Sequence, residues 1–275
     1  MPFPSEEKAL SQTPSHSTWD ELLALAEDAA RQAGEDLRRR LSVPHTVKAK
    51  GLRDFVTEAD VAAERLILER IRQRFPTHGI VSEESAPDPA FGGGTCWAVD
   101  PLDGTSNFAR GLPLFSVSVA ALEGGRPVVG VIYEPVPGRT FRARRGGGAW
   151  LNGTPARVRR VDRLLSAMVC LDWGRAQEDR LKVLARVQRL GPEVGVFRTL
   201  GSAALGLAYV AVGWLDAYFH LALGPWDTAA GVLLVEEAGG RVTQVDGSPW
   251  APEATSILAS NGALHDQLLE CLRPA

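Results

Sequence analysis

The stretch DPLDGTSNF, residues 100–108, predicts a strand end followed by a tight turn that brings several oxygen atoms to one place. It follows a β-prone run, so Asp100 is expected to close a strand, and a proline and Gly104 then force the chain to turn. The carboxylates of Asp100 and Asp103 and the backbone carbonyl of Leu102 can converge there. Three oxygen ligands within four residues suit a hard cation such as Mg²⁺. In the alternative, Asp100 only caps the turn by accepting a hydrogen bond from the Gly104 N–H, and no metal binds.

Other acidic patches also stand beside Gly, Ser or Thr where the chain is expected to reverse. They are DFVTEAD (residues 54–60), the pair Glu83 and Glu84, and Asp227 in PWDTAAG. Carboxylates that cluster without compensation repel each other and shift towards protonation unless a cation neutralises them. Together the patches favour a Mg²⁺-dependent phosphatase, in which backbone N–H groups at a turn or helix start hold the phosphate.

Taken singly, these acidic residues have structural alternatives. Asp60 could be the N-cap of a helix, and Asp227 could interact with the positive end of a helix dipole. Glu84 could be solvated, and Thr57 could serve only to cap a helix. The combination of the patches, more than any one residue, indicates a metal site.

The composition excludes several classes of protein. The chain has 275 residues, 45% of them hydrophobic, and a net charge of −3, which argues against an electrostatic nucleic-acid binder. Its three cysteines are too few for a disulfide framework or a zinc cluster, which suggests a reduced, cytoplasmic protein. No run is apolar enough to span a bilayer, so no membrane association is expected. Residues 1–17 are polar and are interpreted as a disordered tail.

Helical periodicity begins at Thr18, which with Glu21 forms a capping-box pattern, and continues to about residue 41. A second helix is expected from Asp60 until Pro76 ends it. Between them, residues 43–55 (VPHTVKAKGLRDF) have no clear period and are interpreted as a mobile loop.

The middle of the chain has the period of strands. The expected strands are residues 79–82, 97–99, 115–122 and 128–133, followed by a hairpin over 139–153. The hairpin carries a basic cluster that alternates with apolar residues, which predicts the solvated outer face of a strand; its members are Arg139, Arg142, Arg144 and Arg145.

Helices and strands then alternate. Helices are expected at residues 178–190, 202–212, 225–238 and 264–272, with strands at 215–221, 241–245 and 256–259. The pattern predicts an α+β half over 18–153, which carries most of the metal ligands, and an α/β half over 154–275.

The ordered set of motifs resembles the inositol monophosphatase family of lithium-sensitive, magnesium-dependent phosphatases. The motifs are DFVTEAD, VSEES, DPLDGTSNF and PWDTAAGVLLVEEAGG, with GGGAWLNG between the last two, and the resemblance runs from about residue 19 to the C-terminus. It implies a layered αβαβα sandwich, a homodimer, and a site between the two halves that binds two to three Mg²⁺ ions.

The resemblance also implies a ligand set for each ion. Glu83, Asp100 and the carbonyl of Leu102 would hold the first Mg²⁺, and Asp100, Asp103 and Asp227 the second. A third, weaker ion would rely on Glu83 and water.

Other residues take catalytic and supporting roles by the same resemblance. Asp60 and Thr105 would orient the attacking water, and the backbone N–H groups of Gly104 and Thr105 would hold the phosphate. Lys50 and Asp54 lie on the loop that closes over the metals in the family, and Glu84 would support the site beside them.

Substrate contacts are expected at the turn Gly201, Ser202 and Ala203 and at His220. In the family the residue seven before the motif aspartate is often a glutamate that accepts a hydrogen bond from a substrate hydroxyl. Here it is His220, which can donate or accept, although its ring could equally pack at a strand end.

The resemblance implies hydrolysis of inositol monophosphate or a related small sugar or polyol phosphate. The alternatives are a fructose-1,6-bisphosphatase, a histidinol-phosphate phosphatase or a nucleotide 3'-phosphatase of the same superfamily. A non-catalytic regulatory protein on this fold is a further alternative.

Overall fold

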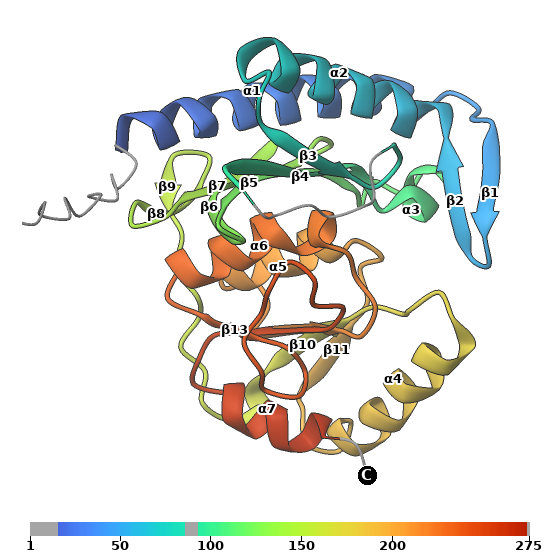
Figure 1. The fold of residues 1–275 in the computed structure, drawn as a ribbon. Coiled ribbons are helices and arrows are strands. Elements are labelled where there is room, and N and C mark those ends of the chain that lie inside the picture. The colour runs from blue at the N-terminus through green and yellow to red at the C-terminus, as the bar shows by residue number, and fades with distance from the viewer. Residues whose placement is uncertain (1–15, 86–92, 274–275) are drawn as a thin grey trace, which may run out of the picture.

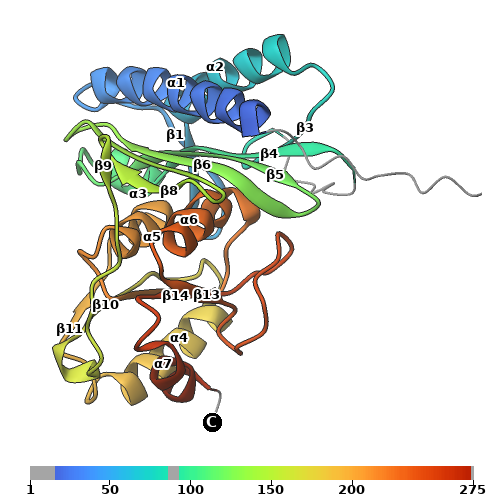
Figure 2. The ribbon, with the colours of Figure 1, turned by 90° about the vertical axis from the view of Figure 1, so that its left-hand side faces the viewer.

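The computed structural model describes residues 16–85 and 93–273, which stack in five layers (Figure 1). Two long helices cover a large sheet, a second helix pair lies beneath that sheet, a smaller sheet follows, and two more helices close the other end (Figure 2). The predicted αβαβα sandwich is therefore confirmed. None of the described helices is both long and apolar enough to cross a bilayer.

The helices are α1 (His16–Arg40), α2 (Glu58–Arg74), α3 (Thr105–Phe108), α4 (Gln177–Leu190), α5 (Ala203–Ala211), α6 (Pro225–Glu237) and α7 (His265–Leu272), with a 3₁₀ turn at Leu164–Ser166. The strands of the large sheet are β3 (Gly79–Ser82), β4 (Thr95–Asp103), β5 (Ser116–Glu123), β6 (Arg126–Glu134), β7 (Arg139–Arg144), β8 (Gly148–Leu151) and β9 (Thr154–Pro155). The small sheet has β10 (Met168–Leu171), β11 (Val196–Arg198), β12 (Ala217–His220), β13 (Arg241–Thr243) and β14 (Ile257–Ser260), and β1 (Val47–Gly51) pairs with β2 (Asp54–Thr57).

The large sheet has the strand order β3-β4-β5-β6-β7-β8-β9, and only the β3–β4 pair is parallel. Alternate residues of its strands point to opposite faces. Trp97 and Val99 join the core under α1 and α2, whereas Ala98 between them joins the core over α5 and α6. A Cβ atom at Gly130 of β6 would lie 2.8 Å from the Cα atom of Ala230, so α6 packs directly on the sheet backbone. This close packing fixes the start of α6 relative to the end of β4.

The small sheet has the order β11-β10-β12-β14-β13 and lies between α5 and α6 on one side and α4 and α7 on the other (Figure 1). Its strands β10 and β11, of four and three residues, were not predicted. β11 has no buried residue that would impose a period, and β10 is a short continuous apolar run whose periodicity does not identify it as a strand.

The N-terminal helix differs from the prediction at its start. α1 begins at His16, so Thr18 lies inside the first turn and is not the N-cap. Residues 16 and 17 are helical where the sequence suggested tail, and the predicted tail at 1–15 lies outside the described residues. The helix itself is confirmed, because its apolar stripe, which includes Leu22, Ala26 and Leu37, is fully buried.

Two other predictions were wrong. Residues 47–57, expected to be mostly mobile loop, form the antiparallel hairpin β1–β2, and all five residues of β1 are exposed. A strand with no core beneath it shows no apolar alternation. The basic cluster of β7 is not a freely solvated face either, because Arg142 pairs with Glu27 of α1 at 2.9 Å and Arg139 pairs with the buried Glu134.

Candidate functional site

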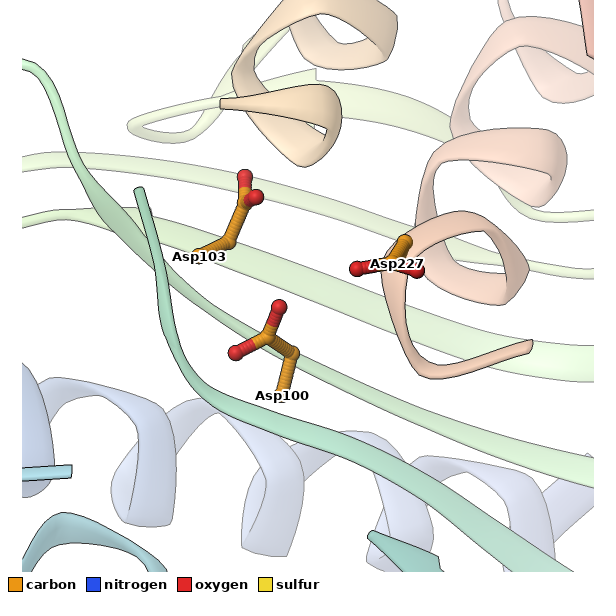
Figure 3. Close-up of side chains that lie close together, drawn as sticks. All are labelled: Asp100, Asp103 and Asp227. Carbon is orange, nitrogen blue, oxygen red and sulfur yellow. The ribbon is translucent and has the colours of Figure 1, made fainter. Parts of the chain in front are cut away.

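Three carboxylates meet where the end of β4 faces the first turn of α6 (Figure 3). Asp100 and Asp103 come from β4 and Asp227 from α6, and one oxygen of each lies within 4.8 Å of the others. Asp100 and Asp103 are buried and Asp227 is half-buried. The two residues of β4 can face the same point because the pairing of β4 with β5 shifts register between them.

The turn after Asp100 is built for this convergence. Asp100 Oδ1 accepts a hydrogen bond from the Leu102 N–H at 2.9 Å, so the alternative in which Asp100 caps the turn through the Gly104 N–H named the wrong partner. Gly104 has φ of 100° and begins α3, and a Cβ atom there would lie 3.0 Å from the Leu114 carbonyl oxygen. Only glycine fits this backbone without strain.

Asp103 is held by the start of α5. Its Oδ2 atom accepts hydrogen bonds from the Ala204 N–H at 2.8 Å and from the Ser202 hydroxyl, and its Oδ1 atom accepts one from the Ala203 N–H at 3.1 Å. Burial raises the pKa of Asp103 to about 6, against the effect of these hydrogen bonds. Ser202 and Ala203, expected to contact substrate, therefore bind this carboxylate in the structure.

Asp227 is the third residue of α6, and its Oδ2 atom accepts a hydrogen bond from the N–H of the N-cap residue Gly224 at 2.6 Å. Burial, followed by the negative charge of Glu83, raises the pKa of both Asp100 and Asp227 well above the usual range. These carboxylates therefore resist ionisation together unless a cation compensates them. Buried hard oxygen donors in this number fit Mg²⁺.

Glu83 lies directly after β3 and is surrounded by cations. Arg175 contacts both Glu83 Oε1 and Asp54 Oδ1 at 3.1 Å, and Lys50 contacts Glu83 Oε1 at 3.5 Å and Glu84 Oε1 at 2.7 Å. The structure thus brings together Lys50, Asp54 and Glu84, which were expected beside the site. Sequence reasoning missed Arg175, which comes from the loop after β10 and belongs to no recognisable motif.

Asp60, which is buried, and Thr105, which is half-buried, form a hydrogen-bonded pair next to the acidic cluster. The Thr105 hydroxyl donates to Asp60 Oδ1 at 2.9 Å and also lies 3.1 Å from the Leu102 carbonyl oxygen. Asp60 Oδ2 accepts hydrogen bonds from the N–H and the hydroxyl of Thr57 at 2.8 and 2.6 Å. Thr57 is the N-cap of α2 and Asp60 the third residue of its capping box, so the alternative of Asp60 as N-cap was wrong.

Two further buried carboxylates were missed by sequence reasoning. Asp172 Oδ1 accepts a hydrogen bond from the Gly201 N–H at 2.8 Å, and burial raises the pKa of Asp172 to about 7. Glu64 of α2 accepts hydrogen bonds from the Ser82 hydroxyl and the Ser85 N–H, the latter at 3.1 Å. Both side chains fix loops of the site from residues distant in sequence, which no local motif could reveal.

His220 lies at the end of β12, where it is buried. Its Nδ1 atom accepts a hydrogen bond from the Ala222 N–H at 2.9 Å, and the ring also bonds to the backbone of Trp173. Burial lowers the pKa of His220 to about 4, so the ring is neutral at physiological pH. The ring borders the site, but its hydrogen bonds go to the backbone.

Most of these residues line one cavity of about 610 Å³, whereas Lys50, Asp60, Glu64 and Glu84 are not part of its lining. This volume is in the range of small-molecule sites. Its lining includes the following side chains and backbone groups: Asp54, Glu83, Asp100, Leu102, Asp103, Gly104, Thr105, Asp172, Arg175, Gly201, Ser202, Ala203, His220 and Asp227. A cavity lined by clustered carboxylates and other polar groups can hold metal ions and a phosphorylated small molecule together.

Comparison with known proteins shows the family to which this chain is similar. The chain is 40% identical to the Arabidopsis thaliana phosphatase IMPL1, over 92% of this chain and 70% of that one. It is also 40% identical to the Nus factor SuhB of Escherichia coli K12, over 92% and 96% of the two chains. The solved inositol monophosphatase from Anabaena superposes with a TM-score of 0.83 at 38% identity, over 93% of this chain and 96% of that one. The model of the inositol monophosphatase family matches residues 18–275, and the chain belongs to this family.

Proposed function

We propose that this chain is a Mg²⁺-dependent phosphomonoesterase that hydrolyses inositol monophosphate or a related small sugar or polyol phosphate. Its family membership supports a phosphatase of this superfamily. The observation that carries the proposal is the convergence of Asp100, Asp103 and Asp227 within 4.8 Å, beside the hydrogen-bonded pair of Asp60 and Thr105. The similarity to a chain named Nus factor leaves a regulatory role as the alternative. A purely regulatory protein, however, has no need for a cavity lined by clustered carboxylates with raised pKa values.

The residues that would hold two to three Mg²⁺ ions are the three aspartates with Glu83 and the Leu102 carbonyl. When bound, Mg²⁺ would lower the pKa of a water molecule and neutralise charge on the phosphoryl oxygens.

The protein's own groups would position the nucleophile. Because the Thr105 hydroxyl donates its hydrogen bond to Asp60, its oxygen lone pairs would be the acceptors for a water O–H. Water would then attack phosphorus in line, the P–O ester bond would break, and the alcohol would leave with a proton. Gly104, whose φ of 100° no side chain tolerates easily, keeps the turn open to the phosphate. We expect no phosphoenzyme, since water is the attacking group.

Three further properties belong to this proposal. We propose a homodimer, inhibition by Li⁺ through replacement of one Mg²⁺, and a cytoplasmic location. The last is supported by the free state of Cys96, Cys170 and Cys271 in the structure.

The test is release of inorganic phosphate from a panel of inositol, sugar, histidinol and nucleotide phosphates, with Mg²⁺ and with excess chelator. We expect turnover that depends fully on Mg²⁺, because the side chains that line the cavity do not by themselves supply a sufficient electrophile for the phosphoryl group. Turnover that persists in chelator would contradict the metal requirement. Absence of release from every ester with Mg²⁺ present would favour the regulatory alternative.

A further inference from the structure

Asn107 connects α3 to a loop that lies 93 residues away in the sequence. Its side-chain NH₂ group donates to the Leu114 carbonyl oxygen at 2.7 Å and to the Leu200 carbonyl oxygen at 2.8 Å. Leu114 lies just before β5 of the large sheet, whereas Leu200 lies between β11 of the small sheet and α5. The Asn107 side chain is half-buried and is not part of the cavity lining. It therefore joins elements around the site without facing the cavity.

The two contacts of Asn107 require an amide side chain. Carbonyl oxygens only accept hydrogen bonds, so each of the two needs an N–H group of its own. The NH₂ group of asparagine supplies both, whereas a carboxylate of the same shape supplies none. Because one rigid group binds both carbonyls, it fixes the distance between the two segments that carry them.

The loop that Asn107 reaches is shaped for this contact. Gly201 follows Leu200 and has φ of 70°, and a Cβ atom there would lie 3.0 Å from the Asn107 amide nitrogen and 3.2 Å from its amide oxygen. Any other residue at this position would press on Asn107 or shift the loop. The Gly201 N–H donates to Asp172 Oδ1 at 2.8 Å. The loop is thus held by Asn107 and by Asp172.

This loop leads directly into the start of α5, which holds Asp103. The hydroxyl of the N-cap residue Ser202 and the N–H groups of Ala203 and Ala204 all donate to this carboxylate. All three donors come within four residues of Leu200, so the loop before them sets where they lie. A buried carboxylate keeps its direction only while the groups that bind it keep theirs.

We propose that Asn107 is a positioning residue for the phosphatase site. By holding the loop at Leu200 and Gly201, it places the donors that direct the Asp103 carboxylate towards the other two aspartates. The part of this inference that concerns Mg²⁺ rests on the proposed function, whereas the placement of α5 does not. Partners that orient metal ligands typically change metal affinity by about tenfold to a hundredfold when they are removed.

The first test is calorimetric titration of Mg²⁺ into wild type and Asn107→Ala without substrate. The variant leaves two carbonyl groups without their donor and frees the loop, so the Kd for Mg²⁺ should rise by about tenfold to a hundredfold. Asn261→Ala is the matched control, because the Asn261 NH₂ group likewise donates to a backbone carbonyl, that of Val161, at 2.8 Å, and Asn261 is not part of the cavity lining. Its melting temperature should fall as much as that of Asn107→Ala, with unchanged affinity for Mg²⁺.

The second test is hydrogen–deuterium exchange without Mg²⁺ over residues 200–206. In Asn107→Ala the backbone N–H groups of this segment should exchange about tenfold faster than in wild type, since the loop has lost one of the groups that hold it. Asn261→Ala should match wild type over the same residues. If Asn107→Ala does not fold, Asn107→Ser, which keeps one donor, takes its place and should show a smaller change in the same direction.

Failure of this inference can be distinguished from failure of the proposed function. If wild type binds Mg²⁺ and Asn107→Ala binds it equally well, or if Asn261→Ala weakens binding as much, the positioning role is overturned and the phosphatase stands. If wild type neither binds Mg²⁺ nor releases phosphate, the proposed function fails and exchange alone decides. Faster exchange over 200–206 in Asn107→Ala but not in Asn261→Ala would then support the placement of α5 by Asn107. Equal exchange in wild type and Asn107→Ala overturns the inference in either case.

Discussion

Replacement of Asp100 by asparagine is expected to abolish phosphate release while the protein remains folded. Asp100 is one of the three converging carboxylates and is the most enclosed of them, with 1% of its surface exposed. Asparagine keeps one side-chain oxygen but loses the negative charge that would compensate a cation, so kcat should fall by at least about a thousandfold. The measurement is phosphate release at saturating substrate and Mg²⁺ for purified wild type and variant.

Stability should respond to the same substitution in the opposite direction. The folded-state pKa of Asp100 is raised, so above that pKa the folded protein carries a buried charge that the unfolded chain tolerates better. Without Mg²⁺ at pH 8, Asp100→Asn should therefore unfold at the same temperature as wild type or higher. As the pH falls through the raised folded-state pKa, the difference should begin to shrink, and it should vanish only below the pKa of the carboxyl in the unfolded chain, about 4.

Asp266→Asn is a matched control for both measurements. Asp266 lies on α7, is 84% exposed, and pairs with Arg241 at 2.8 Å, far from the acidic cluster in the layer order. It should have wild-type activity and no pH-dependent gain in stability. A clear drop in the melting temperature of Asp100→Asn at pH 8, or near-normal kcat, would refute the repulsion argument or the metal role respectively.

The parts of the fold that the sequence predicted are those with a strong local signal. The helix over 225–237 has proline at its first residue and paired glycines behind it, and β5 and β6 are eight and nine residues long and almost entirely buried. The hairpin β1–β2 and the short strand β11 were missed for the opposite reason. Neither has a buried face of its own that would impose a period on its residues.

In the candidate site, too, the residues that could be predicted are those with a local sequence signal. Asp100, Asp103 and Asp227 could be identified because motifs of charge and turn residues surround each of them. Asp172 and Arg175 could not, because they act through contacts with segments that only the folded chain brings near. The roles of neighbouring residues were also hard to predict. Ser202 was expected to face a substrate, yet its hydroxyl binds Asp103, which is possible only when α5 packs against the end of β4.

Thr105→Ala is expected to lower kcat by about a hundredfold with little change in KM. The Thr105 hydroxyl is held between Asp60 Oδ1 at 2.9 Å and the Leu102 carbonyl oxygen at 3.1 Å, so its free lone pairs have a fixed direction. A group that only positions the attacking water contributes in the transition state and not to ground-state binding. Thr105→Ser keeps the hydroxyl and should restore most of kcat.

Asp60→Asn should lower kcat similarly, but at some cost in stability. Asp60 Oδ2 accepts hydrogen bonds from both the N–H and the hydroxyl of Thr57. An amide NH₂ at either carboxylate position would replace an acceptor by a donor, which weakens the capping box of α2 by about 1 kcal/mol or the bond to Thr105. Ser106→Ala, next to Thr105 in the cavity lining, is the control and should leave kcat nearly unchanged. If Thr105→Ala and Asp60→Asn instead raised KM at constant kcat, both residues would be substrate contacts, and the water would have to be positioned by other groups.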